Sequence, residues 1–188
     1  MPSSDPTTIP KVVSIIKTLM PRSILDVGCA TGKYGLLFRE YLDISYGRLD
    51  PADWEITIDA VEIDESYLTP VHDYIYDNVW TTDWLYFSRT NVYDVIFMGD
   101  ILEHWPEGKW QRALSKAKRL SKIVIVVCPN WQGSITQGSF YGHEQERHRV
   151  ALTPEIVGGR CLFANSKQFI TVFDTYELEL LEGKDVLL

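Results

Sequence analysis

The sequence has few basic residues, few cysteines and no long apolar run. It contains 18 Lys and Arg against 26 Asp and Glu, which gives a formal net charge of −8. Nucleic-acid-binding surfaces depend on clustered Lys and Arg, so no nucleic-acid partner is expected. The three cysteines, Cys29, Cys128 and Cys161, form no CxxC pair. This spacing gives no zinc signature and favours reduced thiols in the cytoplasm.

The chain also lacks the apolar segments that mark membrane and secreted proteins. No run approaches ~18 apolar residues, and the first ten residues lack a basic start followed by an apolar core. We therefore expect a cytoplasmic location and no membrane partner. With 188 residues, 45% of them hydrophobic, the chain is long enough to bury a real core. We expect a single domain over residues 1–188, as a monomer or a homodimer, with a helix in residues 1–20.

The most informative stretch is residues 23–35, which has the pattern of a strand, a turn and a helix. Ile24, Leu25 and Val27 form the short apolar run of a buried parallel strand. Gly28 and Gly32 permit a tight turn, and helical spacing of apolar residues comes next. Free backbone N–H groups at the start of that helix favour a nucleotide-like ligand.

Short apolar runs alternate with helical patterns along the rest of the chain. Strands are expected at residues 23–27, 56–63, 79–80, 92–98 and 123–128, and then at 168–173 and 176–181. The two-residue connection between the last two requires antiparallel pairing. A helix is expected to begin at Thr153, with Pro154 in its first position. This order predicts an α/β fold: a Rossmann-like, doubly wound, mostly parallel seven-stranded sheet with an antiparallel C-terminal strand and helices on both faces.

Four segments carry motifs in the same order as in a known family. They are Asp26-Val-Gly28-Cys-Ala30-Thr-Gly32, Val61-Glu62-Ile63-Asp64, Thr82-Asp83-Trp84, and the run from Tyr93 to His104 that ends in Leu-Glu-His. Together they resemble the class I S-adenosylmethionine-dependent methyltransferases, over nearly the whole chain. The resemblance implies S-adenosylmethionine (SAM) as cofactor and S-adenosylhomocysteine (SAH) as product. It also implies in-line transfer of a methyl group to an O, N or C nucleophile of a small-molecule acceptor.

The resemblance assigns roles to acidic residues at the strand ends. Glu62 would take the ribose hydroxyls, with Asp64 as the alternative, and Asp83 would accept from the adenine amino group. The remaining cofactor-binding residues are expected to be Asp26, Gly28, Ala30, Gly32, Tyr34, Trp84 and Asp100. Independently of the resemblance, carboxylates gathered at strand ends complement the positive sulfonium and ammonium groups of SAM. Each acidic residue alone could equally be a solvated turn or a helix cap.

Ala30 stands where the first motif usually has its middle glycine. We interpret this position as one that needs a small side chain more than a positive φ. A nicotinamide cofactor fits less well, because GxGxxG is absent and the next acidic residue of the pattern lies more than thirty residues on instead of about 20. An NAD(P)-dependent oxidoreductase is thus the less favoured alternative to a methyltransferase. A non-catalytic Rossmann-like binding or assembly module is the other alternative.

The candidate catalytic residues are polar groups near the ends of the later strands. Methyl transfer from a sulfonium needs alignment in a dry pocket, and a base helps when the acceptor carries a proton of high pKa. His148, His104 and Glu103 are the candidates, although each could instead hold loop backbone in place. Further possible bases or orienting partners are His143, Glu144 and Glu146.

Residues 131–153 are polar, Gly-rich and predicted to form a lid loop on the acceptor side. Trp131, Tyr141, Arg147 and Arg149 are expected to bind the acceptor. The two arginines would receive a carboxylate or phosphate, or would pair with glutamates of the same loop. No metal is expected, because four residues separate His143 from His148 and the two make no i, i+4 pair.

Overall fold

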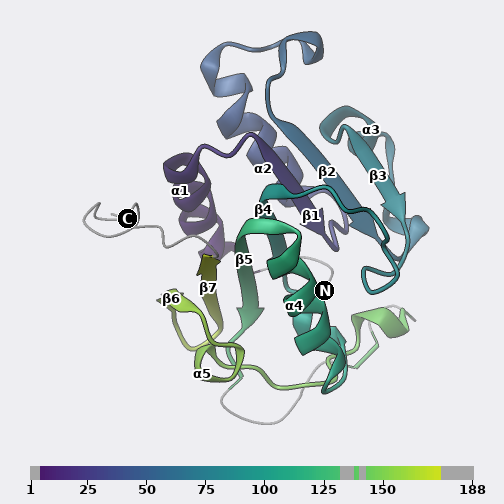
Figure 1. The fold of residues 1–188 in the computed structure, drawn as a ribbon, viewed down its shortest axis with the longest axis vertical. Coiled ribbons are helices and arrows are strands. Elements are labelled where there is room, and N and C mark those ends of the chain that lie inside the picture. The colour runs from purple at the N-terminus through teal and green to yellow at the C-terminus, as the bar shows by residue number, and fades with distance from the viewer. Residues whose placement is uncertain (1–4, 132–137, 140–142, 175–188) are drawn as a thin grey trace.

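The computed structural model describes residues 5–131, 138–139 and 143–174 (Figure 1). Its strands are β1 (Ser23–Val27), β2 (Thr57–Glu62), β3 (Asn78–Thr81), β4 (Tyr93–Gly99), β5 (Ser121–Pro129), β6 (Arg160–Ala164) and β7 (Gln168–Asp174). Its α-helices are α1 (Ile9–Leu19), α2 (Lys33–Leu42), α3 (Pro70–Ile75), α4 (Lys109–Arg119) and α5 (Pro154–Val157). Within these ranges, no helix has the length and apolar character needed to span a bilayer.

All seven strands belong to one sheet with the order β3-β2-β1-β4-β5-β7-β6. The pairs from β3 to β5 are parallel, and β7 pairs antiparallel with both β5 and β6. Figure 1 shows the sheet running from β3 at one edge to β6 at the other, with α4 lying over one face. The predicted doubly wound α/β fold is therefore confirmed. The strand order reverses between β1 and β4, where sheets of this kind bind ligands beyond the carboxyl ends of their strands.

Alternate residues of each central strand contribute to two hydrophobic cores. Ile24 and Val95 pack in the core that contains α1, α2 and α3, whereas Leu25 and Ile96 pack in the core that contains α4. The helices present apolar residues at helical spacing toward these cores, such as Val12, Ile15 and Ile16 on α1. The sheet is therefore buried on both faces, as parallel sheets require.

The C-terminal part differs from the prediction in its strand partner. Residues 168–173 form β7 as predicted, but β7 pairs with β6, and residues 176–181 lie outside the described ranges. The helix predicted from Thr153 is only the four-residue α5. Gly158 and Gly159 come after it with φ of +77° and +79°, which end the helix and turn the chain into β6.

Residues 43–55, a polar insertion in sequence, are fixed to the domain by the buried Arg39. The Arg39 guanidinium pairs with Asp43 at 2.6 Å and donates to the carbonyl oxygens of Ile56 and Ile75 at 2.7 and 2.9 Å. The ring of Trp54 covers it, with 4.0 Å between the guanidinium carbon and the ring centroid. The cation can be buried here because it is paired and hydrogen-bonded on several sides.

Candidate active site

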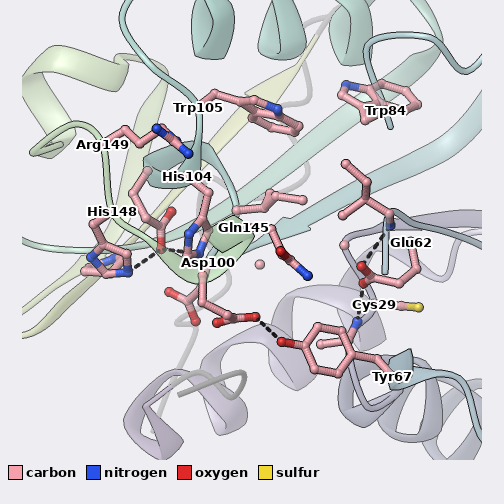
Figure 2. A pocket seen from close by; sticks show the side chains of 18 of the residues that line it. Cys29, Glu62, Tyr67, Trp84, Asp100, His104, Trp105, Gln145, His148 and Arg149 are labelled. Atoms are coloured by element: carbon pink, nitrogen blue, oxygen red, sulfur yellow. Dashed lines mark hydrogen bonds and ion pairs between the residues drawn. The ribbon is translucent and has the colours of Figure 1, made fainter. Parts of the chain in front are cut away.

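A cavity of about 740 Å³ opens at the carboxyl ends of the parallel strands. Of the residues predicted from the sequence, those on the cofactor side that line it are Gly28, Ala30, Tyr34, Glu62, Asp83, Trp84 and Asp100. On the acceptor side they are Glu103, His104, Trp131, Glu144, Glu146, His148 and Arg149. Figure 2 shows Glu62 and Trp84 at one end of the cavity and His104 and His148 at the other. The cavity therefore brings most of the predicted site together at the topological switch point.

The other predicted site residues do not contribute to this lining. Asp26 and Gly32 are absent from the cavity wall, and so is Arg147. Arg147 instead forms an exposed ion pair with Glu144 at 3.0 Å, which is the alternative that the sequence left open. Tyr141 lies outside the described residues, as do the rest of 140–142 and residues 132–137 of the predicted lid.

The turn after β1 has left-handed backbone at three positions. Gly28, Ala30 and Gly32 have φ of +76°, +46° and +80°. A Cβ on Gly28 would lie 2.3 Å from Cδ1 of Ile101, so glycine is required there for space as well as conformation. The interpretation that Ala30 needs small size more than a positive φ is wrong. Ala30 adopts the left-handed region, which costs an L-residue about 1–2 kcal/mol.

Two hydrogen bonds hold Ala30 in this conformation. Its N–H donates to Oε2 of Glu62 at 2.9 Å, and its carbonyl oxygen lies 2.8 Å from Nε2 of His72. Nδ1 of His72 accepts from the backbone N–H of Thr69 at 3.1 Å, so Nε2 carries the proton that is donated to Ala30. The turn is thus tied both to β2 and to α3.

Glu62, the last residue of β2, holds a fixed carboxylate at the cavity. Oε2 accepts from Ala30, and Oε1 accepts from the N–H groups of Ile63 and Asp64 at 2.8 and 3.0 Å. Burial raises the pKa of Glu62, while the three N–H groups oppose this rise by stabilising the anion. A carboxylate has about four lone-pair positions, so one stays available for a hydroxyl donor from a ligand.

Asp64, the alternative for ribose binding, has other partners. It accepts from the backbone N–H of Ser66 at 3.0 Å, and its Oδ2 lies 2.8 Å from Nδ1 of His143. Neither Asp64 nor His143 is among the cavity-lining residues. The geometry therefore favours Glu62 over Asp64 for a ligand in the cavity, and it separates His143 from the acceptor end.

Asp83 and Trp84 form a rigid part of the wall on the cofactor side. Asp83 accepts from the N–H of Leu85 at 2.8 Å. The indole N–H of Trp84 donates to the carbonyl of Ala113 at 3.1 Å, and the Trp84 side chain is almost fully buried in the α4 core. An adenine-sized ring at this end would meet a fixed carboxylate and a fixed aromatic wall.

Glu103, His104 and His148 form a cluster at the acceptor end. Glu103 and His104 lie on the 3₁₀ turn Leu102–His104 after β4, and His148 comes from the segment after the turn Glu144–Glu146. Burial raises the pKa of Glu103 well above its usual range. Burial also lowers the pKa of His104 and, together with the neighbouring His104, lowers that of His148 to about 4. Both imidazoles are therefore neutral near pH 7.

Residues 143–149, which include His148, form hydrogen bonds at both ends of the cavity. The backbone N–H of Arg149 donates to the carbonyl of Glu103 at 2.7 Å. On the cofactor side, the hydroxyl of Tyr67 donates to Oε1 of Glu146 at 2.8 Å. Figure 2 shows Gln145 of this segment between the two ends. The segment therefore bridges the cofactor and acceptor sides.

Several cavity-lining residues were missed by the sequence reasoning. They include Lys33, Tyr67, Trp105, Gln145 and Lys167. Lys33 directly follows the last glycine of the first motif, so its place at the start of α2 was a usable signal. Tyr67 lies in an aromatic stretch of ambiguous periodicity. Lys167 precedes β7 and joins the wall only because β7 pairs beside β5.

Comparison with known proteins identifies the fold. No protein-family model and no curated protein sequence matches the chain. Among solved structures, the DhpI–SAM–HEP complex matches with a TM-score of 0.64 at 11% identity, over 88% of this chain and 84% of that one. The N-terminal domain of EvdMO1, determined in the presence of SAH and D-fucose, gives 0.63 at 15% identity, over 92% and 84%. The methyltransferase domain of bacterial CtHen1 gives 0.58 at 21% identity, over 87% and 95%.

These structures share one architecture with this chain at low sequence identity. The seven-stranded sheet with an antiparallel ending, and the cavity at the switch point, agree with it. The chain therefore has the fold of the class I S-adenosylmethionine-dependent methyltransferases, as the sequence motifs indicated.

Proposed function

We propose that this chain is a SAM-dependent methyltransferase that transfers a methyl group to a small-molecule acceptor. The main support for this proposal is the carboxylate of Glu62, which three backbone N–H groups hold at the edge of the cavity. A ribose hydroxyl is the donor that such a carboxylate would take. Several of the matching structures were determined with SAM or SAH, which supports the same cofactor here.

The charges and walls of the cavity support this orientation of the cofactor. Adenine would lie toward Asp83 and Trp84, the ribose on Glu62, and the sulfonium toward Asp100. More acidic than basic side chains line the cavity, so its field complements a cationic cofactor. The acceptor atom would bond to the methyl carbon while the carbon–sulfur bond breaks and leaves its electron pair on sulfur. Alignment in a water-poor cavity supplies much of the rate enhancement.

The acceptor would occupy the end of the cavity lined by Trp131, His148 and Arg149. The total volume falls within the range usual for small-molecule sites. A matching structure, that of the EvdMO1 domain, was determined with D-fucose present as well as SAH. A polar metabolite with hydroxyl groups, methylated in the cytoplasm, fits this end of the site.

The cofactor assignment is tested by calorimetric titration of the chain with SAH. We expect micromolar binding by the wild type and an affinity at least about tenfold weaker for Glu62→Gln, because the hydroxyl acceptor loses its charge. Glu65→Gln is the matched control, since Glu65 is exposed and does not line the cavity. Absence of SAH binding by the wild type would contradict the proposal.

Two further measurements separate the alternatives. Transfer of radiolabelled methyl from SAM into a metabolite extract is expected from a methyltransferase. SAH binding without any such transfer would favour the non-catalytic binding module. A change in NADH fluorescence on mixing, without SAH binding, would favour the oxidoreductase.

A further inference from the structure

The Glu103, His104 and His148 cluster has the composition and spacing of a cation site. Each residue offers one donor atom, and these three atoms all lie within 4.8 Å of one another. Nε2 of His104 and Nε2 of His148 lie 4.0 and 3.9 Å from Oε1 of Glu103. Metal–ligand bonds of about 2.0–2.2 Å place neighbouring donors roughly 3–4 Å apart, so small side-chain rotations would suffice.

The central carboxylate has an unused oxygen. The side chain of Glu103 is fully buried, and among the described residues its Oε1 has no hydrogen-bond partner. Both imidazole distances exceed the 2.7–3.2 Å of a hydrogen bond, so the cluster is no glutamate–histidine dyad. A buried carboxyl oxygen without a partner is unfavourable, and a cation between the three side chains would supply that partner and stabilise the ionised form of Glu103.

The hydrogen bonds and packing of His104 and His148 leave each imidazole a nitrogen lone pair for a cation. Nδ1 of His104 lies 3.3 Å from the carbonyl oxygen of Arg147, so Nδ1 carries the proton and Nε2 directs its lone pair toward Glu103. His148 is 7% exposed, and its Nδ1 has no partner among the described residues. The rings of His104 and Trp131 pack edge-on against His148 and fix its orientation. Neutral imidazole is the form that binds metal.

We propose that Glu103, His104 and His148 bind one divalent transition-metal ion at the acceptor end of the cavity. Two imidazole nitrogens and one carboxylate oxygen suit Zn²⁺, Co²⁺, Mn²⁺ or Fe²⁺ better than Mg²⁺ or Ca²⁺, which prefer oxygen ligands. Three protein ligands leave coordination positions open toward the cavity. The expectation of no metal was based on His143 and His148, whereas the cluster here pairs His148 with His104.

This site would select a hydroxyl as the acceptor group, an inference that rests on the proposed methyltransferase function. A cation held by these three residues would lower the pKa of an acceptor hydroxyl, which could then lose its proton to water at the open end of the cavity. The oxygen then bonds to the methyl carbon of SAM, and the carbon–sulfur bond breaks with its electron pair on sulfur, giving SAH. The cation is unchanged by the transfer, and the acceptor class becomes hydroxyl-bearing small molecules.

Titration of the chelator-treated chain with CoCl₂ tests the site. We expect one Co²⁺ per chain, with visible ligand-field absorption that ZnCl₂ abolishes by displacement. Glu103→Gln and His148→Gln should each weaken Co²⁺ binding at least about tenfold. The matched controls are Glu144→Gln and His143→Gln, whose side chains lie on the same segment as His148 but outside the cluster; both should bind within about twofold of wild type.

SAH titration of the same samples separates the two proposals and checks folding. A variant that binds SAH like the wild type but has lost Co²⁺ binding supports the cation site. If the wild type binds Co²⁺ but not SAH, the cation site is supported and the proposed methyltransferase function is contradicted. No Co²⁺ binding by the wild type, or equal weakening in the cluster variants and the controls, overturns the cation site.

Discussion

The phenol of Tyr76 donates a 2.7 Å hydrogen bond to the buried carboxylate of Asp26. Asp26 is the acidic residue of the first motif, yet it lies in the core beside α3 and away from the cavity lining. Burial raises its pKa to about 7; the Tyr76 hydrogen bond acts against this rise, and the nearby Glu62 charge adds to it. In this structure Asp26 and Tyr76 form a polar pair packed behind the glycine turn.

Asp26→Asn is expected to reduce the dependence of stability on pH. The pKa of this carboxyl is near 3.8 in the unfolded chain and about 7 in the folded chain, so the folded chain keeps the proton up to a higher pH. The free energy of unfolding therefore falls as pH rises from about 4 to 7, by about 2–3 kcal/mol from this group between pH 5 and pH 8. Urea unfolding at both pH values measures the difference. Asp53→Asn, at an exposed position, should keep the wild-type difference; an unchanged difference in Asp26→Asn would contradict the raised pKa.

Ala30→Gly is expected to stabilise the chain. Ala30 has φ of +46°, and removing its Cβ relieves about 1–2 kcal/mol of left-handed strain. Glycine also makes the unfolded chain more flexible, which lowers stability by roughly 0.4–1 kcal/mol. We therefore expect the free energy of unfolding, measured in urea, to rise by about 0.5–1 kcal/mol. Ala52→Gly, in the 3₁₀ turn Pro51–Asp53, is the control and should lower stability. A loss of stability in Ala30→Gly would show that the turn is not strained.

The central parallel strands β1, β2, β4 and β5 could be predicted because each is rich in apolar residues and largely buried. β6 could not, because it is an edge strand whose residues are exposed or half-buried. Its apolar run, Cys161 to Ala164, is only four residues long and has no fully buried member, so its pairing with β7 is what defines it as a strand. Gly158 and Gly159 precede it, and their left-handed backbone ends α5 without specifying that the next element is a strand.

The candidate site was predictable where a motif fixes a residue to a strand end, as for Glu62 and Asp83. The direction of each side chain was not, because it depends on packing between distant segments. Asp64 meets His143 across 79 positions of sequence, and this contact removes both from the cavity. In the same way, His148 lies near Glu103 because residues 143–149 pack over the turn after β4.

Arg39→Lys is expected to destabilise the chain by about 2–4 kcal/mol in urea unfolding. A lysine keeps the charge but cannot bond at once to Asp43 and to the carbonyl oxygens of Ile56 and Ile75, so buried acceptors lose their donors. Arg22→Lys is the control, because Arg22 forms an exposed ion pair with Glu55 and should change stability by less than about 0.5 kcal/mol. Similar effects of the two substitutions would contradict the anchoring role of Arg39.

Tyr67→Phe is expected to loosen the segment that bridges the two ends of the cavity. The change removes the hydroxyl that donates to Oε1 of Glu146 at 2.8 Å, while the ring can still stack on His143 at 5.3 Å between centroids. We expect a loss of about 1 kcal/mol in unfolding free energy and faster amide hydrogen exchange in residues 143–149. If this segment also covers bound cofactor, SAH should dissociate faster. Tyr86→Phe, at a position 81% exposed, should change neither quantity. Wild-type exchange in Tyr67→Phe would mean that the link from Arg149 to Glu103 holds the segment on its own.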